Sequence, residues 1–334
     1  MGKWKVVSVG LGPVGASIAK LALKRRSQIE IVGAVDSDPK LVGKDLGSVL
    51  GLDKNTGISI QKEGKKGLYK QADIVLHATT SFLSTAKPQL LEFCENGVDV
   101  VSTCEELSFP WFNHAETAKE LDSAAKKNNV TLLGTGVNPG FVLDALAVTM
   151  SGVCHSVSEI RATRILDATK RRVPFQMKVG IGLSLDKFEE NVRTGKFGHI
   201  GLPESLALTC ASMGVEVDKI DQKISPKIAT SPVKTEQFGV VERGKVIGLV
   251  QDGNAFAKGK RIASYHIEMY AGASDPYDEI EFIGVPNISL RIPGGTPGDI
   301  ATAAMIVNSI PRVIDSLAGL LTVKDLRPAA SVLS

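Results

Sequence analysis

Residues 5–36 read KVVSVGLGPVGASIAKLALKRRSQIEIVGAVD. A short apolar run is followed by the glycine turn 10–15, by a helical pattern over 16–25 and by a second apolar run that ends at Asp36. This order predicts a strand, a tight turn, a helix and a second strand. We therefore expect one βαβ unit at the start of the chain, with an acidic residue directly after its second strand.

The turn has the pattern Gly-x-Gly-x-x-Gly, in which each glycine has a physical role. Gly10 permits the tight turn, Gly12 lets a pyrophosphate approach the backbone, and Gly15 lets the helix pack closely on the strand. The helix N-terminus adds free N–H groups for the phosphates, and Asp36 lies where an acid accepts hydrogen bonds from an adenosine ribose. The alternative is a glycine turn without a ligand. The context on both sides favours a dinucleotide-binding unit.

The composition is typical of a globular protein long enough for two domains. The chain has 334 residues, of which 43% are hydrophobic and 22% are charged. A net charge of +3 does not favour nucleic acid or a membrane surface as a partner, and no apolar run approaches the length of a membrane span. The four cysteines have no zinc spacing, and the N-terminus has no signal-peptide pattern. We therefore expect a cytoplasmic protein with reduced thiols and no metal site.

Three further apolar runs, at 73–77, 98–101 and 130–133, are predicted strands that end in small or polar residues. Helices are expected before these runs, at 41–50, and after them, at 142–150. Ligands of an open parallel sheet bind outside the carboxyl ends of the strands. The first run ends in Ala78-Thr79-Thr80-Ser81, which suits a loop against the cofactor. The alternative for these hydroxyl residues is an N-cap of the helix expected at 82–95.

The second run ends in STCEEL, residues 102–107, which contains two adjacent glutamates. A carboxylate near a nicotinamide ring can take a proton from an amine or from water. The alternative for Glu105 and Glu106 is a helix-start pair favoured by the helix dipole. Neighbouring residues at a strand end tend to point to different sides, so we expect only one of the two to face the nicotinamide. Cys104 has no strong base beside it in the sequence and is expected to be a packing residue.

The second half of the chain has a different pattern. Strand-like segments recur from residue 157 onward, at 158–166, 234–242, 246–254, 261–271, 279–283 and 288–292, and residues 243–245 are expected to form a hairpin turn. Helical stretches are expected at 185–193 and 203–213, and the pattern returns to helix after 297. We therefore predict an α/β protein. A Rossmann-type doubly wound parallel sheet is expected over 1–137, and an α+β substrate and oligomerisation domain with a mixed or antiparallel sheet over 138–295. The helical segment 296–334 is expected to pack back on the first domain.

Candidate substrate-binding residues lie in the second half. The segment 164–172 carries four cations, and a substrate carboxylate would be bound by such a group. His199 lies between glycines that allow close approach. The loop around Thr296 offers N–H donors and a hydroxyl to an anion or to the nicotinamide end of the cofactor. The alternatives are a solvated basic loop, a structural histidine and ordinary turn and capping chemistry.

Several separated motifs resemble the 2,4-diaminopentanoate dehydrogenase family and its relatives, the native amine dehydrogenases, within the dihydrodipicolinate reductase-like superfamily. The resemblance covers nearly the whole chain, and these motifs are STCEEL at 102–107, TGVNPGF at 135–141, GHIGL at 198–202 and the loop 291–300. It implies oxidative deamination of an amine by NAD(P)⁺ and water, with one catalytic glutamate in the first motif. In the diaminopentanoate enzymes the amine at carbon 4 is oxidised during ornithine degradation.

The chain departs from the pattern of dihydrodipicolinate reductase itself. That family has a paired-histidine segment with a lysine and a Ser-Gly-Thr loop, whereas residues 164–172 contain no histidine pair. Its G-T-T-G-F motif is replaced by TCEE at 103–106. A dihydrodipicolinate-type imine reductase is therefore the second choice of function. A non-catalytic NAD(P)-binding sensor is a third, because it needs the glycine loop but no carboxylate at the nicotinamide.

These arguments give a set of candidate residues. The cofactor is NAD or NADP, because Asp36 repels a 2′-phosphate whereas Lys40 and Lys44 would attract it. The partners expected are a small amine substrate and a second copy of the chain, in a homodimer or larger homo-oligomer. The residues expected to bind the cofactor are Gly10, Leu11, Gly12, Pro13, Val14, Gly15, Asp36, Ser37, Ala78, Thr79, Thr80, Thr103 and Cys104. Those expected to bind the substrate are Asn138, Pro139, Arg164, Asp167, His199 and Thr296, and Glu105 or Glu106 is the expected base.

Overall fold

The chain folds into two compact units. The computed structural model describes residues 2–25, 27–64, 67–195 and 197–332. Unit 1 contains Met1–Phe141 and Pro297–Ser334, and unit 2 contains Val142–Thr296. The domain boundaries expected from the sequence follow residues 137 and 295. In the structure the chain passes from unit 1 to unit 2 after Phe141 and returns to unit 1 after Thr296.

Unit 1 is built on a sheet of seven parallel strands in the order β15-β6-β5-β4-β1-β2-β3. β1 lies between β2 and β4, so the strand order reverses at β1 and creates a switch point, where ligands of such sheets bind. The expected doubly wound α/β architecture is confirmed. The strands are β1 (Trp4–Val9), β2 (Ile29–Val35), β3 (Ile60–Gln61), β4 (Ile74–His77), β5 (Asp99–Ser102), β6 (Thr131–Gly134) and β15 (Gly319–Leu321).

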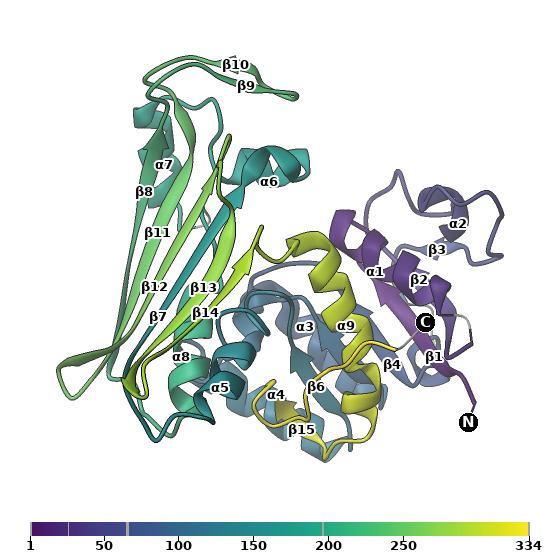
Figure 1. Cartoon of the computed structure of the whole chain (residues 1–334). Coiled ribbons are helices and arrows are strands. Elements are labelled where there is room, and N and C mark those ends of the chain that lie inside the picture. The colour runs from purple at the N-terminus through teal and green to yellow at the C-terminus, as the bar shows by residue number, and fades with distance from the viewer. Residues whose placement is uncertain (1, 26, 65–66, 196, 333–334) are drawn as a thin grey trace. The chain divides into compact units, whose positions relative to one another are not determined.

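Helices cover both faces of this sheet (Figure 1). On one face, α1 (Pro13–Lys24) and α9 (Gly298–Ile314) pack against each other and share an apolar core with the strands. On the other face, α3 (Leu83–Glu95) and α4 (Ala115–Lys127) enclose a second core. α9 follows unit 2 in the sequence but contacts β4, β5 and β6, so the C-terminal segment completes unit 1.

Two helices begin later than the sequence suggested because an aspartate caps each one. The helix expected at 41–50 is only α2 (Leu46–Val49), which starts after Asp45. The Asp45 carboxylate accepts four backbone N–H hydrogen bonds, and the backbone donors hold its pKa below the usual value. The helix expected at 142–150 is α5 (Ala145–Ser151), which starts after Asp144. An aspartate in this position satisfies N–H groups that the first turn leaves unpaired.

Unit 2 is an α+β unit with a mixed six-stranded sheet in the order β14-β13-β7-β12-β11-β8. β7 and β12 are parallel, and the other neighbouring strands are antiparallel. This confirms the expected mixed sheet. Its strands are β7 (Ser156–Asp167), β8 (Lys219–Ile228), β11 (Val246–Ala257), β12 (Lys260–Tyr270), β13 (Tyr277–Val285) and β14 (Ile288–Pro293). The remaining elements are η3 (Ala168–Lys170), α6 (Val173–Lys178), α7 (Leu185–Arg193), α8 (Leu202–Ser212), β9 (Val233–Thr235) and β10 (Gly239–Val241).

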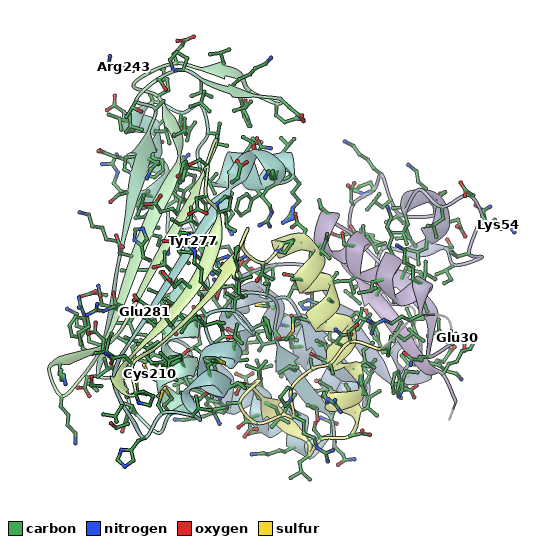
Figure 2. The ribbon with its side chains drawn as sticks, in the orientation of Figure 1. Glu30, Lys54, Cys210, Arg243, Tyr277 and Glu281 are labelled. Carbon is green, nitrogen blue, oxygen red and sulfur yellow. The ribbon has the colours of Figure 1, made fainter. Side chains whose placement is uncertain are left out.

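α8 packs directly on β11 and β12. Gly253 of β11 makes this possible, since a Cβ there would lie 2.9 Å from Leu206 Cδ1. The alternating residues of the strands separate a face buried under helix from a partly exposed face. Tyr277 and Glu281 of β13 lie on the partly exposed face (Figure 2), whereas Asp278 and Ile280, which point to the other face, are buried.

Two details of unit 2 differ from the sequence-based expectations. β8 was missed because its residues alternate weakly and include Pro226, which suits an edge strand. The turn at 243–245 was expected to close a hairpin. It joins β10 to β11, but these strands belong to different sheets, because β10 pairs with β9.

The first prediction concerns Asp99, which begins β5 and accepts the Thr131 N–H at 2.7 Å. Burial raises the pKa of Asp99 to about 6, and the nearby Asp73 adds to the rise. A raised carboxyl pKa in the folded state makes stability fall as the pH rises from about 4 to 6. Asp99→Asn keeps the acceptor and removes the charge. We expect its free energy of unfolding, from urea titrations, to exceed that of the parent by on the order of 1 kcal/mol at pH 7, with the difference shrinking toward pH 4. A constant difference over that range contradicts the assignment.

Candidate active site

The glycine turn between β1 and α1 has the geometry of a phosphate loop. Gly10 has a φ of 84°, and a Cβ there would lie 2.5 Å from the Ala78 carbonyl oxygen. A Cβ on Gly15 would lie 1.8 Å from the Gly10 oxygen, so these two glycines are required by packing. Gly12 has open space around its Cβ position, and α1 begins at Pro13 without a side-chain cap. The loop therefore leaves room and N–H donors for a pyrophosphate.

Asp36 connects the end of β2 to this loop. Its Oδ2 accepts the Leu11 N–H at 2.6 Å, and its Oδ1 accepts the Asp38 N–H at 2.8 Å. A carboxylate has about four acceptor positions, so two bonds leave capacity for ribose hydroxyls. The residues that follow, Ser37 and Lys40 among them, are exposed. The glycine turn and the acid thus fit the adenosine half of a dinucleotide.

Backbone hydrogen bonds join the loops at the carboxyl ends of neighbouring strands. The Ala78 N–H donates to the Val9 carbonyl oxygen at 2.8 Å, the Thr103 N–H to His77 at 2.9 Å, and the Thr135 N–H to Ser102 at 2.9 Å. The sheet order therefore brings the glycine turn, the loop after β4 and the loop after β5 to one edge. The structure thus groups the unit 1 candidates that the sequence placed after these strands.

The two glutamates of η2 (Glu105–Ser108) have different partners. Glu106 Oε2 accepts the Leu83 N–H at 2.6 Å, at the start of α3, and lies 3.4 Å from His114 Nε2. Glu105 Oε1 accepts the Ser81 hydroxyl at 2.9 Å. The carboxylate of Glu106 therefore caps a helix, while that of Glu105 is bonded to a side chain of the loop after β4.

His77, the last residue of β4, is fully buried within a hydrogen-bond network. Its Nδ1 lies 2.7 Å from Ser102 Oγ, and its Nε2 lies 2.8 Å from both Gln89 Oε1 and Thr79 Oγ1. Burial lowers the pKa of His77 to about 4. With the amide oxygen of Gln89 as acceptor, Nε2 carries the proton and Nδ1 accepts from Ser102. His77 is thus a neutral structural residue, in line with the usual role of a lone strand-end histidine.

Cys104 is buried, and burial raises the pKa of its thiol to about 12. A neutral thiol is not a nucleophile, which agrees with its expected packing role. Among residues 2–25, 27–64, 67–195 and 197–332, no three His, Cys, Asp or Glu side chains are grouped so as to hold a metal ion. Over the same ranges, no helix has the length and apolarity to cross a membrane.

The loop after β6 lies beside the first turns of α9. The Val137 N–H donates to Thr302 Oγ1 at 3.4 Å, and a Cβ on Gly136 would lie 3.5 Å from Thr302 Cγ2. Within this loop the peptide bond between Asn138 and Pro139 is cis. Asn138 is half-buried and Pro139 is buried, so only Asn138 has a partly accessible side chain.

Arg164 has a different environment from the one expected of a carboxylate-binding residue. Its side chain is 3% exposed, and its Nη1 lies 2.9 Å from Oδ1 of Asp278, which is 1% exposed. Nη2 donates to the Thr296 carbonyl oxygen at 2.8 Å, and Asp278 Oδ2 accepts the Thr296 N–H at 2.7 Å. The ion pair holds Thr296 inside unit 2 and leaves Arg164 almost fully buried, which does not favour the predicted role of Arg164 in binding a substrate.

Asp167 and His199 are also held by contacts within unit 2. Asp167 Oδ1 accepts the Thr169 N–H at 3.0 Å and its hydroxyl at 2.7 Å, so Asp167 caps η3. The buried amide of Gln251 accepts the His199 N–H at 2.8 Å and donates to the His199 carbonyl oxygen at 2.9 Å. These contacts fix the backbone of His199 and leave its half-buried ring as a candidate.

The C-terminal half of the chain matches the family model of the 2,4-diaminopentanoate dehydrogenase C-terminal domain over residues 141–334. The chain is also 32% identical over 342 residues to the 2,4-diaminopentanoate dehydrogenase of Acetoanaerobium sticklandii, and the match covers 98% of this chain and 94% of that protein. This chain belongs to the 2,4-diaminopentanoate dehydrogenase family. The resemblance expected from the separated motifs is thereby confirmed.

Two amine dehydrogenases are similar over most of their length. The enzyme from Streptomyces virginiae is 21% identical over 328 residues, which are 92% of this chain and 90% of that protein. The solved structure of amine dehydrogenase from Mycobacterium smegmatis has a TM-score of 0.87 at 26% identity and covers 99% of this chain and 98% of its own. Membership of the 2,4-diaminopentanoate dehydrogenase family confirms the expected class, an oxidoreductase of the amine dehydrogenase type with a nicotinamide cofactor.

Some residues that shape the site were not singled out from the sequence. Ser81 was visible as a hydroxyl at a strand end, but its contact with Glu105 depends on β5 lying beside β4. Gln89 lies inside a helix, and Gln251 lies inside a strand, where nothing local marks them. Their roles arise from pairings between distant segments.

Gly12→Val tests the phosphate loop. The new side chain has room in the free protein, but it fills the space that a pyrophosphate would occupy. We expect NADH and NADPH binding, followed by calorimetry, to weaken at least about tenfold with the melting temperature retained. Parental affinity in the variant would place the phosphates elsewhere.

Proposed function

We propose that this chain catalyses the NAD(P)-dependent oxidative deamination of 2,4-diaminopentanoate to 2-amino-4-oxopentanoate. The reaction consumes the amine, the oxidised cofactor and water, and it yields the ketone, ammonia, the reduced cofactor and a proton. The family supports the substrate class. The observation that carries the mechanism is the division of roles between the adjacent glutamates, in which Glu106 caps α3 while Glu105 bonds the Ser81 hydroxyl.

The residues at the carboxyl edge of unit 1 suit a nicotinamide dinucleotide. The open space at Gly12, the uncapped start of α1 and the remaining acceptor capacity of Asp36 fit its pyrophosphate and ribose. When bound, the cofactor supplies a hydride acceptor for the carbon that carries the amine. The protein has to supply the proton transfers.

Glu105 is the proposed base. Its carboxylate removes a proton from the substrate ammonium, because only the neutral amine nitrogen can support loss of hydride from its carbon. The same carboxylate then takes a proton from the water that attacks the imine carbon. It returns a proton to the nitrogen as ammonia leaves. The proton taken from the ammonium is first released to solvent, which accounts for the proton among the products and restores the carboxylate before water attacks. The proton then taken from the water is the one returned to the nitrogen, so one carboxylate can serve all three steps.

Binding of the substrate's own carboxylate requires a cation. With Arg164 paired to Asp278, the proposed candidates of the basic segment are Arg171 and Arg172, both half-buried in unit 2. A planar guanidinium binds a carboxylate through two parallel hydrogen bonds. Asn138 and His199 remain proposed substrate-binding residues because their side chains are partly accessible.

The proposed function is tested with a panel of amines and both cofactors. The panel contains 2,4-diaminopentanoate, an uncharged amine of similar length and a cyclic imine offered with the reduced cofactor. Formation of reduced cofactor from 2,4-diaminopentanoate, above all other amines, supports the proposal. Turnover of the cyclic imine alone would identify an imine reductase, and cofactor binding without any turnover would identify a sensor.

The two glutamates are predicted to respond differently to replacement by glutamine, which keeps the shape and removes the basicity. Glu105→Gln is expected to lower kcat by roughly 10²–10⁴ while cofactor binding persists. Glu106→Gln can still accept the Leu83 N–H, so it is expected to retain most of kcat and to lose about 0.5–1 kcal/mol of stability at the start of α3. Rate measurements with both variants decide the assignment, and the reverse order of effects, or two fully active variants, would refute it.

Asp36→Ala is predicted to move cofactor preference toward NADP. The change removes a carboxylate that would repel the 2′-phosphate, and exposed Lys40 and Lys44 follow it in the sequence. We expect the ratio of kcat/KM for NAD to that for NADP to fall by roughly tenfold or more, with part of the fall due to loss of the Leu11 contact. An unchanged ratio would show that Asp36 does not meet the ribose.

A further inference from the structure

Ser81 contacts three successive residues of the loop that follows β5. Its hydroxyl donates to Glu105 Oε1 at 2.9 Å, its carbonyl oxygen accepts the Glu106 N–H at 3.2 Å, and the same oxygen lies 3.4 Å from Cys104 Sγ. The neighbouring Leu83 N–H bonds the Glu106 carboxylate at 2.6 Å. The loop after β4 is therefore attached to the whole segment from Cys104 to Glu106, and Ser81 makes most of the connections.

The direction of the Ser81 hydrogen bond has a chemical consequence. An ionised carboxylate only accepts hydrogen bonds, so the Ser81 hydroxyl must donate to Glu105. A donor bonded to the charged form of a carboxylate stabilises that form over the protonated one. The contact also restricts the rotation of a side chain with several torsions. It therefore acts on both the basicity and the direction of the Glu105 carboxylate.

We infer that Ser81 is a positioning residue for the amine dehydrogenase reaction: its hydroxyl aims the Glu105 carboxylate and keeps it ionised at the pH of turnover. This inference rests on the proposed function, in which Glu105 moves the protons. The Ser81 bond takes up one of the roughly four acceptor positions of a carboxylate. Ser81 itself takes up no proton in the reaction.

Several titratable groups near Glu105 on its own segment and on the elements that pack against η2 have identified partners. On its own segment, Cys104 is a buried neutral thiol and Glu106 is bonded to Leu83 and near His114. His77 of β4 is buried and neutral above pH about 4. Near the start of α3, which packs against η2, Lys87 pairs with Glu120 at 2.5 Å. The strand β6, which also packs against η2, has no titratable side chain in Thr131–Gly134.

The test compares Ser81→Ala with two matched variants. Ser81→Thr keeps the hydroxyl. Ser108→Ala removes a hydroxyl that also bonds Glu105, but at its backbone carbonyl oxygen, 2.7 Å away, and so controls for general loosening of η2. The measurements are the pH profile of kcat/KM and an NMR titration of isotope-labelled glutamate carboxyl groups, with the Glu105 signal assigned by its loss in Glu105→Gln.

We expect Ser81→Ala to lower kcat/KM about three- to tenfold at neutral pH and to move the acid limb of its pH profile up by about half to one unit. The NMR midpoint of Glu105 is expected to move by a similar amount. Ser81→Thr should restore both midpoints, and Ser108→Ala should leave them at the parental values. The shift should persist in a His114→Gln background, which removes the neighbouring imidazole.

Unchanged midpoints in Ser81→Ala, or an equal shift in Ser108→Ala, would overturn the inference. Because the NMR titration needs no turnover, its result stands whether or not any amine is oxidised. If no amine in the panel reacts while the Glu105 midpoint shifts in Ser81→Ala alone, the proposed function fails and the Ser81 contact is upheld. If the panel confirms deamination and the midpoints stay fixed, only the Ser81 inference fails.

Discussion

The attachment of the loop after β4 to the loop after β5 is the constraint on which the site depends. Parallel pairing of these strands fixes where both loops begin, and the Thr103 N–H bond to His77 extends the pairing by one step. Beyond that point, Ser81 and the start of α3 bond the segment that carries the two glutamates. The position of each carboxylate therefore follows from the register of two strands and the start of one helix.

The loops proposed to bind the cofactor are attached to one another in a similar way. Gly10 lies against the Ala78 carbonyl oxygen, so the glycine turn and the loop after β4 share one packing contact. Asp36 bonds the Leu11 N–H and thereby fixes the turn from the β2 side. Neutral His77 lies beneath these loops and holds Thr79 and Ser102. The parts of unit 1 proposed to meet the dinucleotide and the reacting amine are thus attached to the same buried framework.

The sequence predicted the features that local patterns determine. The glycine turn with its flanking strands and acid specified the βαβ unit, and the apolar runs located β4, β5 and β6. The family resemblance came from separated motifs and was confirmed by the matched family. The local patterns also placed two glutamates after a strand but left their roles open. The direction of each side chain depends on a partner from another segment, which is Ser81 for Glu105 and Leu83 for Glu106.

Arg164 shows the limit of reasoning from residue type. An arginine in a basic segment after a strand suits a carboxylate ligand, but its buried partner Asp278 lies on β13, more than a hundred residues away. β8 escaped prediction for a related reason, since its place at the edge of a sheet explains its proline and its weak alternation. Both cases depend on tertiary pairings that no local pattern contains.

The most direct test of the account is an assay of 2,4-diaminopentanoate deuterated at carbon 4, with ammonia, reduced cofactor and its deuterium content measured together. Oxidative deamination at that carbon predicts equal amounts of ammonia and reduced cofactor, with the deuterium carried on the cofactor, and no such transfer from substrate labelled at carbon 2. Reduced cofactor without deuterium, or ammonia released without reduced cofactor, would contradict it.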